Sequence, residues 1–207
     1  MTISEITAFL ESAFDIFNDY YFESTLPKCA ITIQSSPKAY GHFTTKEVWR
    51  GGEEAARHEI NLGAENLNRP LVNTLATLVH EMVHFYCHIN GIKDTSRSGI
   101  YHNKRFKEEA EQRGLIIEYD KKIGWSKTIP SVLFVDFVKK QWQGAAIEAF
   151  RIGDFCADGR TAKKSSTRKY ICPICAQSVR ATKEVSILCG ICSSDDSPIF
   201  MVNDDAN

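Results

Sequence analysis

The stretch TLATLVHEMVHFYCHING (residues 74–91) carries histidines at intervals of four residues in a background that is otherwise almost entirely apolar. Apolar residues recur at the spacing of one helix face from Leu71 to Tyr86. Pro70 is typical of a helix start, and Gly91 is typical of a helix end. The stretch therefore predicts a long helix whose apolar face packs on the core.

The predicted helix places possible metal ligands side by side. His80 and His84 are just over one turn apart, so both imidazoles project from the same face and can share one ion. Glu81 follows the first histidine, where its carboxylate can take a proton from a metal-bound water. The alternative is a pair of core histidines, but burying two imidazoles and a carboxylate without an ion is costly. His88 lies two turns from His80, roughly 12 Å along the axis, which is too far for a shared ion.

A catalytic zinc site takes three protein ligands and leaves a fourth position for water, so another ligand must come from elsewhere in the chain. His102 is a candidate, because it follows a loop long enough to fold back over the helix and precedes a second helical pattern. The rivals are glutamates of that second helix: Glu108, Glu109 and Glu111. His42 and His58 fall among predicted strands, and we expect them to lie at the surface or to line a cleft.

The rest of the first 155 residues predicts a mixture of helices and short strands. An amphipathic pattern predicts a helix over residues 3–22, and helical spacing returns from about Asn103 to Arg113 and again after Pro130. Alternating or β-branched segments predict strands at 29–35, 39–45 and 58–62. We expect an α+β fold in which helices pack on a small antiparallel sheet.

Seven cysteines do not suit a fully paired disulfide framework. Four of them form two Cys-x-x-Cys pairs near the C-terminus, Cys172 with Cys175 and Cys189 with Cys192. Each pair can present two thiolates, and the residues between the pairs are long enough for a hairpin, which predicts a structural zinc ribbon. The remaining cysteines, Cys29, Cys87 and Cys156, lie in apolar runs and are predicted to be buried packing residues.

Charge and hydropathy restrict the class of protein. A net charge of −1 argues against coating nucleic acid by bulk charge, although a local basic patch is compatible with it. The N-terminus has no basic start followed by an apolar run, and no stretch approaches the length of a membrane span. We expect a cytoplasmic protein that does not enter membranes.

The segment from His80 to Leu115, HEMVHFYCHINGIKDTSRSGIYHNKRFKEEAEQRGL, resembles the metal-binding segment of SprT-like zinc metalloproteases, which include the Spartan proteases that degrade proteins crosslinked to DNA. Two features carry the resemblance: the His-Glu-Met-x-His helix, and the later Gly-x-x-His-x-x-x-Phe stretch formed by Gly99, His102 and Phe106. The resemblance covers roughly residues 1–125. It implies a zincin-like fold, with zinc held by His80, His84 and His102 and with Glu81 as the general base.

Basic residues cluster before and within the ribbon. The linker and hairpin carry Arg160, Lys163, Lys164, Arg168, Lys169, Arg180 and Lys183. Such a patch can track phosphates, so DNA is a predicted partner; a merely solvated linker is the alternative. We expect a SprT-like metallopeptidase domain at 1–155, a basic linker at 156–169, and a zinc ribbon with an acidic tail, mobile beyond Val202, at 170–207.

These features predict a zinc-dependent metalloprotease with one catalytic and one structural zinc that acts on a protein substrate. Proteins associated with or crosslinked to DNA are candidate substrates. An extended substrate would lie against the edge strand expected at His58–Leu62. Tyr101 is a candidate for stabilising the oxyanion. The alternative is a regulatory protein whose ribbon binds nucleic acid and whose helix metal site is structural and not catalytic.

Overall fold

The computed structural model describes residues 1–36, 38–51, 55–152 and 167–204. By its internal contacts the chain divides into two units, Met1–Cys156 and Ala157–Asn207. Most of the predicted basic linker lies at residues 153–166, outside the described residues, and so does Cys156. Among the described helices, none is long and apolar enough to span a bilayer.

The first helix, α1 (Ile3–Phe22), has the predicted bounds. Its N-terminus is closed by a capping box, in which the Thr2 side chain accepts from the Glu5 backbone N–H and the Glu5 carboxylate accepts from the Thr2 N–H. One face of α1 is buried in the core: Ile6, Leu10, Ala13, Phe14, Phe17 and Phe22. The amphipathic pattern of the sequence therefore describes the packed face of the helix correctly.

Three short strands follow α1 and form one sheet in the order β1-β3-β2. They are β1 (Ala30–Gln34), β2 (Gly41–Phe43) and β3 (Glu59–Gly63). The strands were predicted, but the pairing is mixed: β2 pairs antiparallel with β3, whereas β1 pairs parallel with it. The segment at 58–62 is therefore the central strand and not an edge strand, which corrects the expectation of a purely antiparallel sheet with its edge at His58–Leu62.

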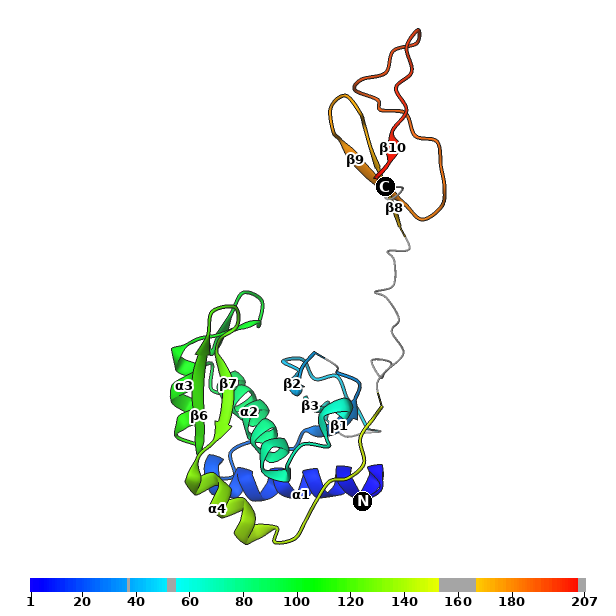
Figure 1. Ribbon diagram of the computed structural model, residues 1–207. Helices are drawn as coiled ribbons and strands as arrows, with labels where there is room; N and C mark the ends of the chain where they lie inside the picture. Colours follow the sequence, from blue (N-terminus) through cyan, green and yellow to red (C-terminus); the bar gives the residue numbers. More distant parts are fainter. Residues whose placement is uncertain (37, 52–54, 153–166, 205–207) are drawn as a thin grey trace. The chain divides into compact units, whose positions relative to one another are not determined.

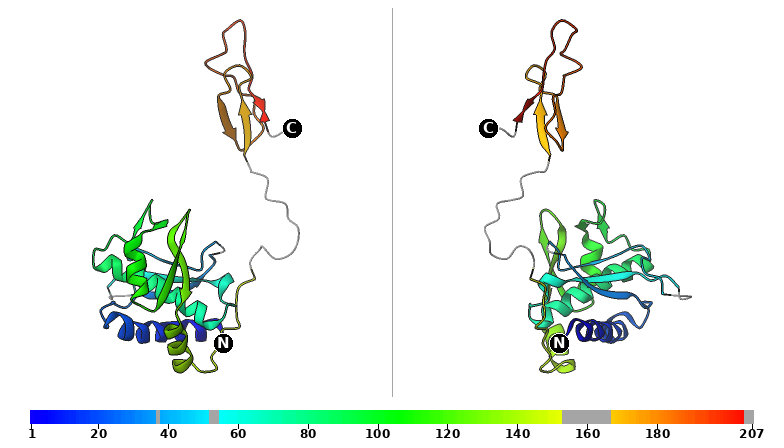
Figure 2. Two further views of the ribbon diagram at one scale, coloured as in Figure 1. Left: turned by 60° about the vertical axis from the view of Figure 1, so that its left-hand side comes forward. Right: turned by 90° about the vertical axis from the view of Figure 1, so that its right-hand side faces the viewer.

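The long helix α2 (Leu71–Ile89) carries the histidines and lies between the two sheets of the first unit (Figures 1 and 2). Pro70 is its N-cap, and Gly91 follows it with a positive φ of 66°, as the sequence predicts. Its apolar side chains, among them Leu75, Leu78 and Val79, are fully buried. Because α2 is packed on both sides, the direction of its polar side chains is fixed by the core.

A second sheet, in the order β4-β5-β7-β6, was not predicted. Its strands are β4 (Thr95–Ser96), β5 (Tyr101–His102), β6 (Leu115–Asp120) and β7 (Gly124–Pro130). Between β5 and β6 lies helix α3 (Lys104–Glu111), whose N-cap Asn103 accepts from the N–H groups of Arg105 and Phe106. The β6–β7 hairpin contains a bulge between Glu118 and Tyr119, which hides the alternation of the strand in the sequence.

The last helix of the first unit, α4 (Val132–Gln141), begins two residues after Pro130 and is shorter than its pattern suggested. Trp142 ends it, so Ala145 and Phe150, which fit the helical spacing, lie beyond its end. Aromatic rings join α4 to α1: Phe17 stacks on Phe134 with ring centroids 5.6 Å apart and lies 5.4 Å from Trp142. These contacts close the core of the first unit on the side away from the β1-β3-β2 sheet (Figure 1).

The ribbon is a small sheet of order β10-β8-β9, with β8 (Arg168–Ile171), β9 (Ser178–Ala181) and β10 (Val202–Asn203). Arg168 and Lys169, predicted to end the linker, are the first residues of β8. The tail was expected to be mobile beyond Val202, but Val202 and Asn203 pair with β8 and Asp204 forms an ion pair with Lys169 at 3.0 Å. For Asn203 and Asp204 the expectation was wrong, because this part of the tail adds a third strand to the sheet and an ion pair; residues 205–207 lie outside the described residues.

The α+β class with a C-terminal ribbon is confirmed. Cys29 and Cys87 are buried packing residues, as predicted, and burial raises the pKa of each thiol to about 12. Both thiols are therefore protonated and unreactive at neutral pH.

Candidate metal centre

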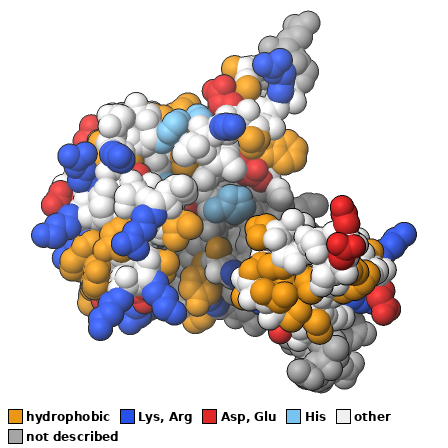
Figure 3. Space-filling model, turned by 90° about the horizontal axis from the view of Figure 1, so that it is seen from above, with side chains coloured by type: hydrophobic (Ala, Val, Ile, Leu, Met, Phe, Trp, Pro, Cys, Tyr) orange, Lys and Arg blue, Asp and Glu red, His pale blue; other side chains and the backbone are white. Residues whose placement is uncertain are grey.

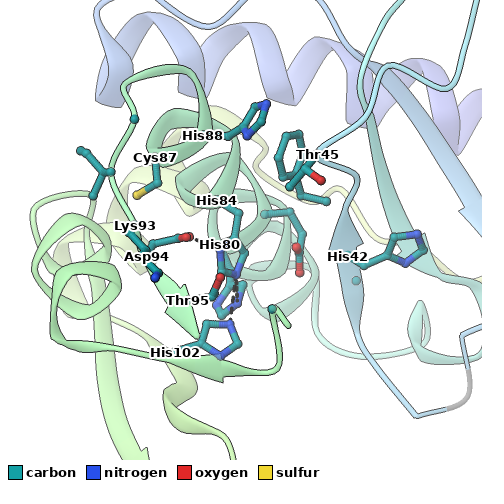
Figure 4. A pocket seen from close by; sticks show the side chains of 16 residues that line it. His42, Thr45, His80, His84, Cys87, His88, Lys93, Asp94, Thr95 and His102 are labelled. Carbon is teal, nitrogen blue, oxygen red and sulfur yellow. Dashed lines mark hydrogen bonds and ion pairs between the residues drawn. The ribbon is translucent and has the colours of Figure 1, made fainter. Parts of the chain in front are cut away.

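The side chains of His80, His84 and His102 converge on one point (Figure 4). The Nε2 atom of His84 lies 3.3 Å from Nε2 of His80 and 3.0 Å from Nε2 of His102. The first two histidines project from one face of α2, and β5 brings the third from the second sheet. Three imidazole nitrogens this close to one another form a donor set that zinc prefers.

Each of these histidines is held through its other ring nitrogen. Nδ1 of His80 lies 2.7 Å from the hydroxyl of Thr128, and Nδ1 of His84 lies 2.5 Å from a carboxylate oxygen of Asp94. Nδ1 of His102 lies 3.3 Å from the carbonyl oxygen of Ile123. A proton held on Nδ1 leaves Nε2 as a lone-pair donor directed at the shared point, which is how proteins orient histidines around a metal.

The charge state of the histidines also suits a metal. Burial, followed by the neighbouring His84 and His102, holds the pKa of His80 well below its ordinary value. Burial and His84 lower the pKa of His102 to about 4. Both imidazoles are therefore neutral near pH 7, which is the form that binds metal ions.

Glu81 lies beside this cluster and is 5% exposed. Burial raises the pKa of its carboxyl group to about 7, against the smaller lowering effects of His84 and of the Phe43 backbone N–H, which donates to the carboxylate. Strand β2 passes very close: a Cβ on Gly41 would lie 3.0 Å from Oε1 of Glu81 and 2.9 Å from the carbonyl oxygen of Asn61. The absence of a side chain at Gly41 is therefore what allows the strand to pack against the carboxylate.

A cavity of about 430 Å³ opens over the histidines. Its walls come from β2, from α2, and from the loop that follows α2. Glu81 and the three histidines lie among the residues that line it (Figure 4). The cluster is thus accessible to a molecule in the cavity, as a site with an open coordination position must be.

The remaining candidates lie outside the histidine cluster, although His42 and His88 line the same cavity. His88 is exposed near the end of α2 and contacts the ring of His58, 5.1 Å away, while His42 points away from the cluster (Figure 4). Glu109 pairs with Arg113 at 2.7 Å and Glu111 with Lys107 at 3.7 Å. Among the described residues, the histidine cluster includes none of these histidines and none of the three α3 glutamates, Glu108, Glu109 and Glu111.

The four ribbon cysteines form a second cluster. The sulfur atoms of Cys172, Cys175, Cys189 and Cys192 lie within 4.8 Å of one another. The N–H of Cys175, and then that of Ile174, donates toward the Cys172 sulfur and lowers the pKa of that thiol to about 7. Thiolates are the form that binds zinc, and four of them without room for water make a closed, structural site.

Sequence reasoning did not find the residues that support the ligands. Thr128 and Asp94 contact His80 and His84, although they lie 48 and 10 positions away along the chain. Asp94 carried a weak signal, because a carboxylate soon after a ligand-bearing helix can reach back to it. For Thr128, Ile123 and Gly41 the sequence held no signal, since their roles depend on the pairing of strands.

The mixed fold, the histidine pair of one helix with a third histidine from outside it, and the adjacent glutamate define a zincin-like domain. The family model described as the SprT-like family matches residues 10–121, which is more than half of the chain. The chain therefore belongs to the SprT-like family, as the resemblance indicated. No curated protein and no solved structure matches it.

Proposed function

We propose that the chain is a zinc-dependent metallopeptidase. The observation that carries this proposal is the convergence of three imidazoles beside a buried carboxylate, at the wall of an open cavity. His80, His84 and His102 would hold the ion. When bound, zinc supplies a Lewis acid that acidifies a water molecule and polarises a carbonyl group. Glu81 takes the proton of the attacking water and returns it to the leaving amine.

The substrate would be an extended peptide that follows β2. This strand pairs with β3 on one side, and β2 has no strand on its other edge in the described part of the chain. Gly41, His42 and Phe43 line the cavity, and the Phe43 N–H contacts Glu81. Addition of a peptide to a free strand edge is a common mode of recognition, and here it would place the peptide bond beside the base.

The alternative is a regulatory protein whose helix site is structural and whose ribbon binds nucleic acid. The two functions differ in ligand number, because a structural zinc site has four protein ligands and a catalytic one has three. Within the described residues the helix cluster contains three histidines and no fourth ligand. This favours the enzyme.

The test is a cleavage assay with an unstructured protein, such as casein, before and after removal of the metal. Chelation should abolish cleavage, and one equivalent of zinc at the helix site should restore it. Cleavage that persists in the fully metal-free chain would refute the metallopeptidase. Binding of zinc without any cleavage would favour the regulatory alternative.

A companion experiment assigns the third ligand. His102→Ala should lower the zinc content by about one ion per chain, because it removes one of three ligands. Glu109→Ala, which lies on α3 and pairs with Arg113, should keep both ions. Loss of zinc in the glutamate variant, with His102→Ala unaffected, would assign the ligand to α3.

We further propose that the linker and ribbon bring the enzyme to DNA-associated proteins. Arg180 and Arg168 use their guanidinium groups within the ribbon, on Thr167 and the Thr182 carbonyl, but both side chains remain exposed or partly exposed. Neutral residues in place of Lys163, Lys164, Arg168 and Lys169 should flatten the salt dependence of DNA binding, since fewer counterions are released. An unchanged slope in an anisotropy titration would remove these residues from the DNA contact.

A further inference from the structure

The charged side chains that line the cavity over the histidines are unequal in sign. In the described part of the chain, the only carboxylates among the lining residues are Glu81 and Asp94. Glu81 is buried and accepts from the Phe43 backbone N–H, and Asp94 pairs with Nδ1 of His84 at 2.5 Å. Neither carboxylate is therefore free to pair with a positively charged side chain of a substrate.

Lys93 adds a positive charge that is not balanced. It belongs to the loop that follows α2 and lines the same cavity (Figure 4). Its side chain is exposed, and it has no ion-pair partner in the part of the chain that the structure describes. Its backbone is held in place, because its carbonyl oxygen accepts from the Asn103 side chain at 2.7 Å. A zinc ion on the histidines would add positive charge to the same cavity.

The hydrogen bonds of β2 indicate how an added peptide would lie. Tyr40 and Thr44 are hydrogen-bonded to β3 or to the residue that follows it in the sheet register. Gly41 and Phe43 alternate with the bonded residues and therefore direct their backbone groups to the free edge, as the Phe43 N–H does toward Glu81. An antiparallel peptide, the commoner pairing, would place the residues before its scissile bond toward the C-terminal end of β2.

The C-terminal end of β2 lies beside the C-terminal end of α2, where the Phe43 ring is 5.8 Å from that of His88. Thr45, His88, Ile92 and Lys93 all line the cavity at this end. Histidine side chains are visible at the molecular surface in Figure 3, in keeping with a cavity that is open to solvent. The residues before the scissile bond would therefore lie nearest to the unbalanced lysine.

We propose that the cavity selects peptides with an acidic side chain one to three residues before the cleaved bond, and that Lys93 binds this side chain. The proposal rests on the proposed peptidase function and names the substrate class of the same site. Complementary charge gives specificity, and a lysine or arginine at the same position would be repelled. Segments of proteins that contact DNA phosphates are basic, so such a site would cut a DNA-associated protein where it does not contact the DNA.

The first test compares two peptides with the full chain as the enzyme. Mass spectrometry of casein fragments identifies a cleaved sequence, and two peptides of this sequence then carry either glutamate or lysine at the three positions before the bond. The glutamate peptide should have a kcat/KM at least about fivefold higher, which is the size of one partly screened charge pair. The ratio should fall toward one as salt is added, because salt screens exposed charges.

Variants of the lysine assign the preference. Lys93→Gln should bring the ratio of the two kcat/KM values close to one, and Lys93→Glu should invert it, because the charge that faces the peptide changes sign. Lys139→Gln is the matched control, since it removes an exposed lysine from α4 and changes the net charge by the same amount. It should keep the ratio of the parent chain. A Lys93→Gln chain that also kept this ratio would overturn the proposal.

A binding measurement separates this proposal from the proposed function. Glu81→Gln in the full chain prevents cleavage, and fluorescence anisotropy gives its affinity for the two labelled peptides. Tighter binding of the glutamate peptide, lost when Lys93→Gln is added, would support the proposal even if the parent chain cleaved nothing, a result that refutes the peptidase alone. Equal affinities and equal cleavage of the two peptides would overturn the acidic preference and leave the metallopeptidase standing. Neither binding nor cleavage of either peptide would overturn both.

Discussion

The hydroxyl of Thr128 and the carboxylate of Asp94 stand behind His80 and His84 and fix which ring nitrogen faces the shared point. The carbonyl of Ile123 does the same for His102. At the scale of single residues, the candidate metal centre is therefore a set of six groups and not three, and the outer three come from β7, from the turn before it and from the loop after α2.

The outer groups should tune metal affinity. Thr128→Val and Asp94→Asn should each weaken zinc binding at the helix site by about 10- to 100-fold, because the ligand ring loses its orientation. Competition with a chromogenic chelator measures this. Thr45→Val is the control, since Thr45 lines the cavity but does not contact a ligand ring in the described structure. Equal affinities in all variants would show that the hydrogen bonds are incidental.

Gly41 provides a residue-scale test of how the base is positioned. Gly41→Ala places a methyl group 3.0 Å from Oε1 of Glu81 and 2.9 Å from the Asn61 carbonyl, so the strand or the carboxylate must shift. Cleavage should fall at least tenfold while both zinc ions stay bound, since a small misplacement of a catalytic group is costly. Gly190→Ala, whose Cβ would meet nothing within 4 Å, should have no effect. Full activity of Gly41→Ala would contradict the assigned packing.

At the scale of elements, helices were easier to predict than strand pairing. The apolar faces of α1 and α2 depend on residues close in sequence, so periodicity identified them and placed the ends of both helices within a few residues. The parallel pairs β1–β3 and β5–β7 join strands that are separated by about 20 or more residues of sequence, and they leave no local signal. That His102 joins the histidine cluster could be predicted from its motif, but the strand that carries it could not.

The β5–β7 pair can be tested through one glycine. A Cβ on Gly124, which has a φ of 76°, would lie 2.1 Å from the carbonyl oxygen of His102. Gly124→Ala should therefore separate β5 from β7 and release zinc from the helix site, while the ribbon keeps its ion. Gly144→Ala has the same φ of 76° with nothing within 4 Å, so it carries the backbone strain without the clash. If both variants lost zinc equally, the strain and not the strand contact would be responsible.

At the scale of the whole molecule, the chain has two clusters of potential metal ligands in separate units. The two should respond differently to metal removal. Alkylation at pH 8 should leave the ribbon cysteines unmodified with zinc present and modify Cys172, Cys175, Cys189 and Cys192 after chelation. Cys29 and Cys87 should stay unmodified in both states, because the pKa of each thiol is raised to about 12. Mass spectrometry assigns the sites, and ribbon cysteines that react with zinc present would contradict the closed site.

The central claim is that Glu81 acts as the base beside a zinc ion that it does not bind. The most direct measurement compares Glu81→Gln with the parent chain in zinc content, thermal unfolding and cleavage of an unstructured protein. The account predicts two zinc ions per chain and an unchanged unfolding temperature, with cleavage reduced at least 100-fold, the contribution typical of a general base. Full proteolysis by Glu81→Gln would contradict the mechanism, and so would loss of one zinc ion, which would make Glu81 a ligand.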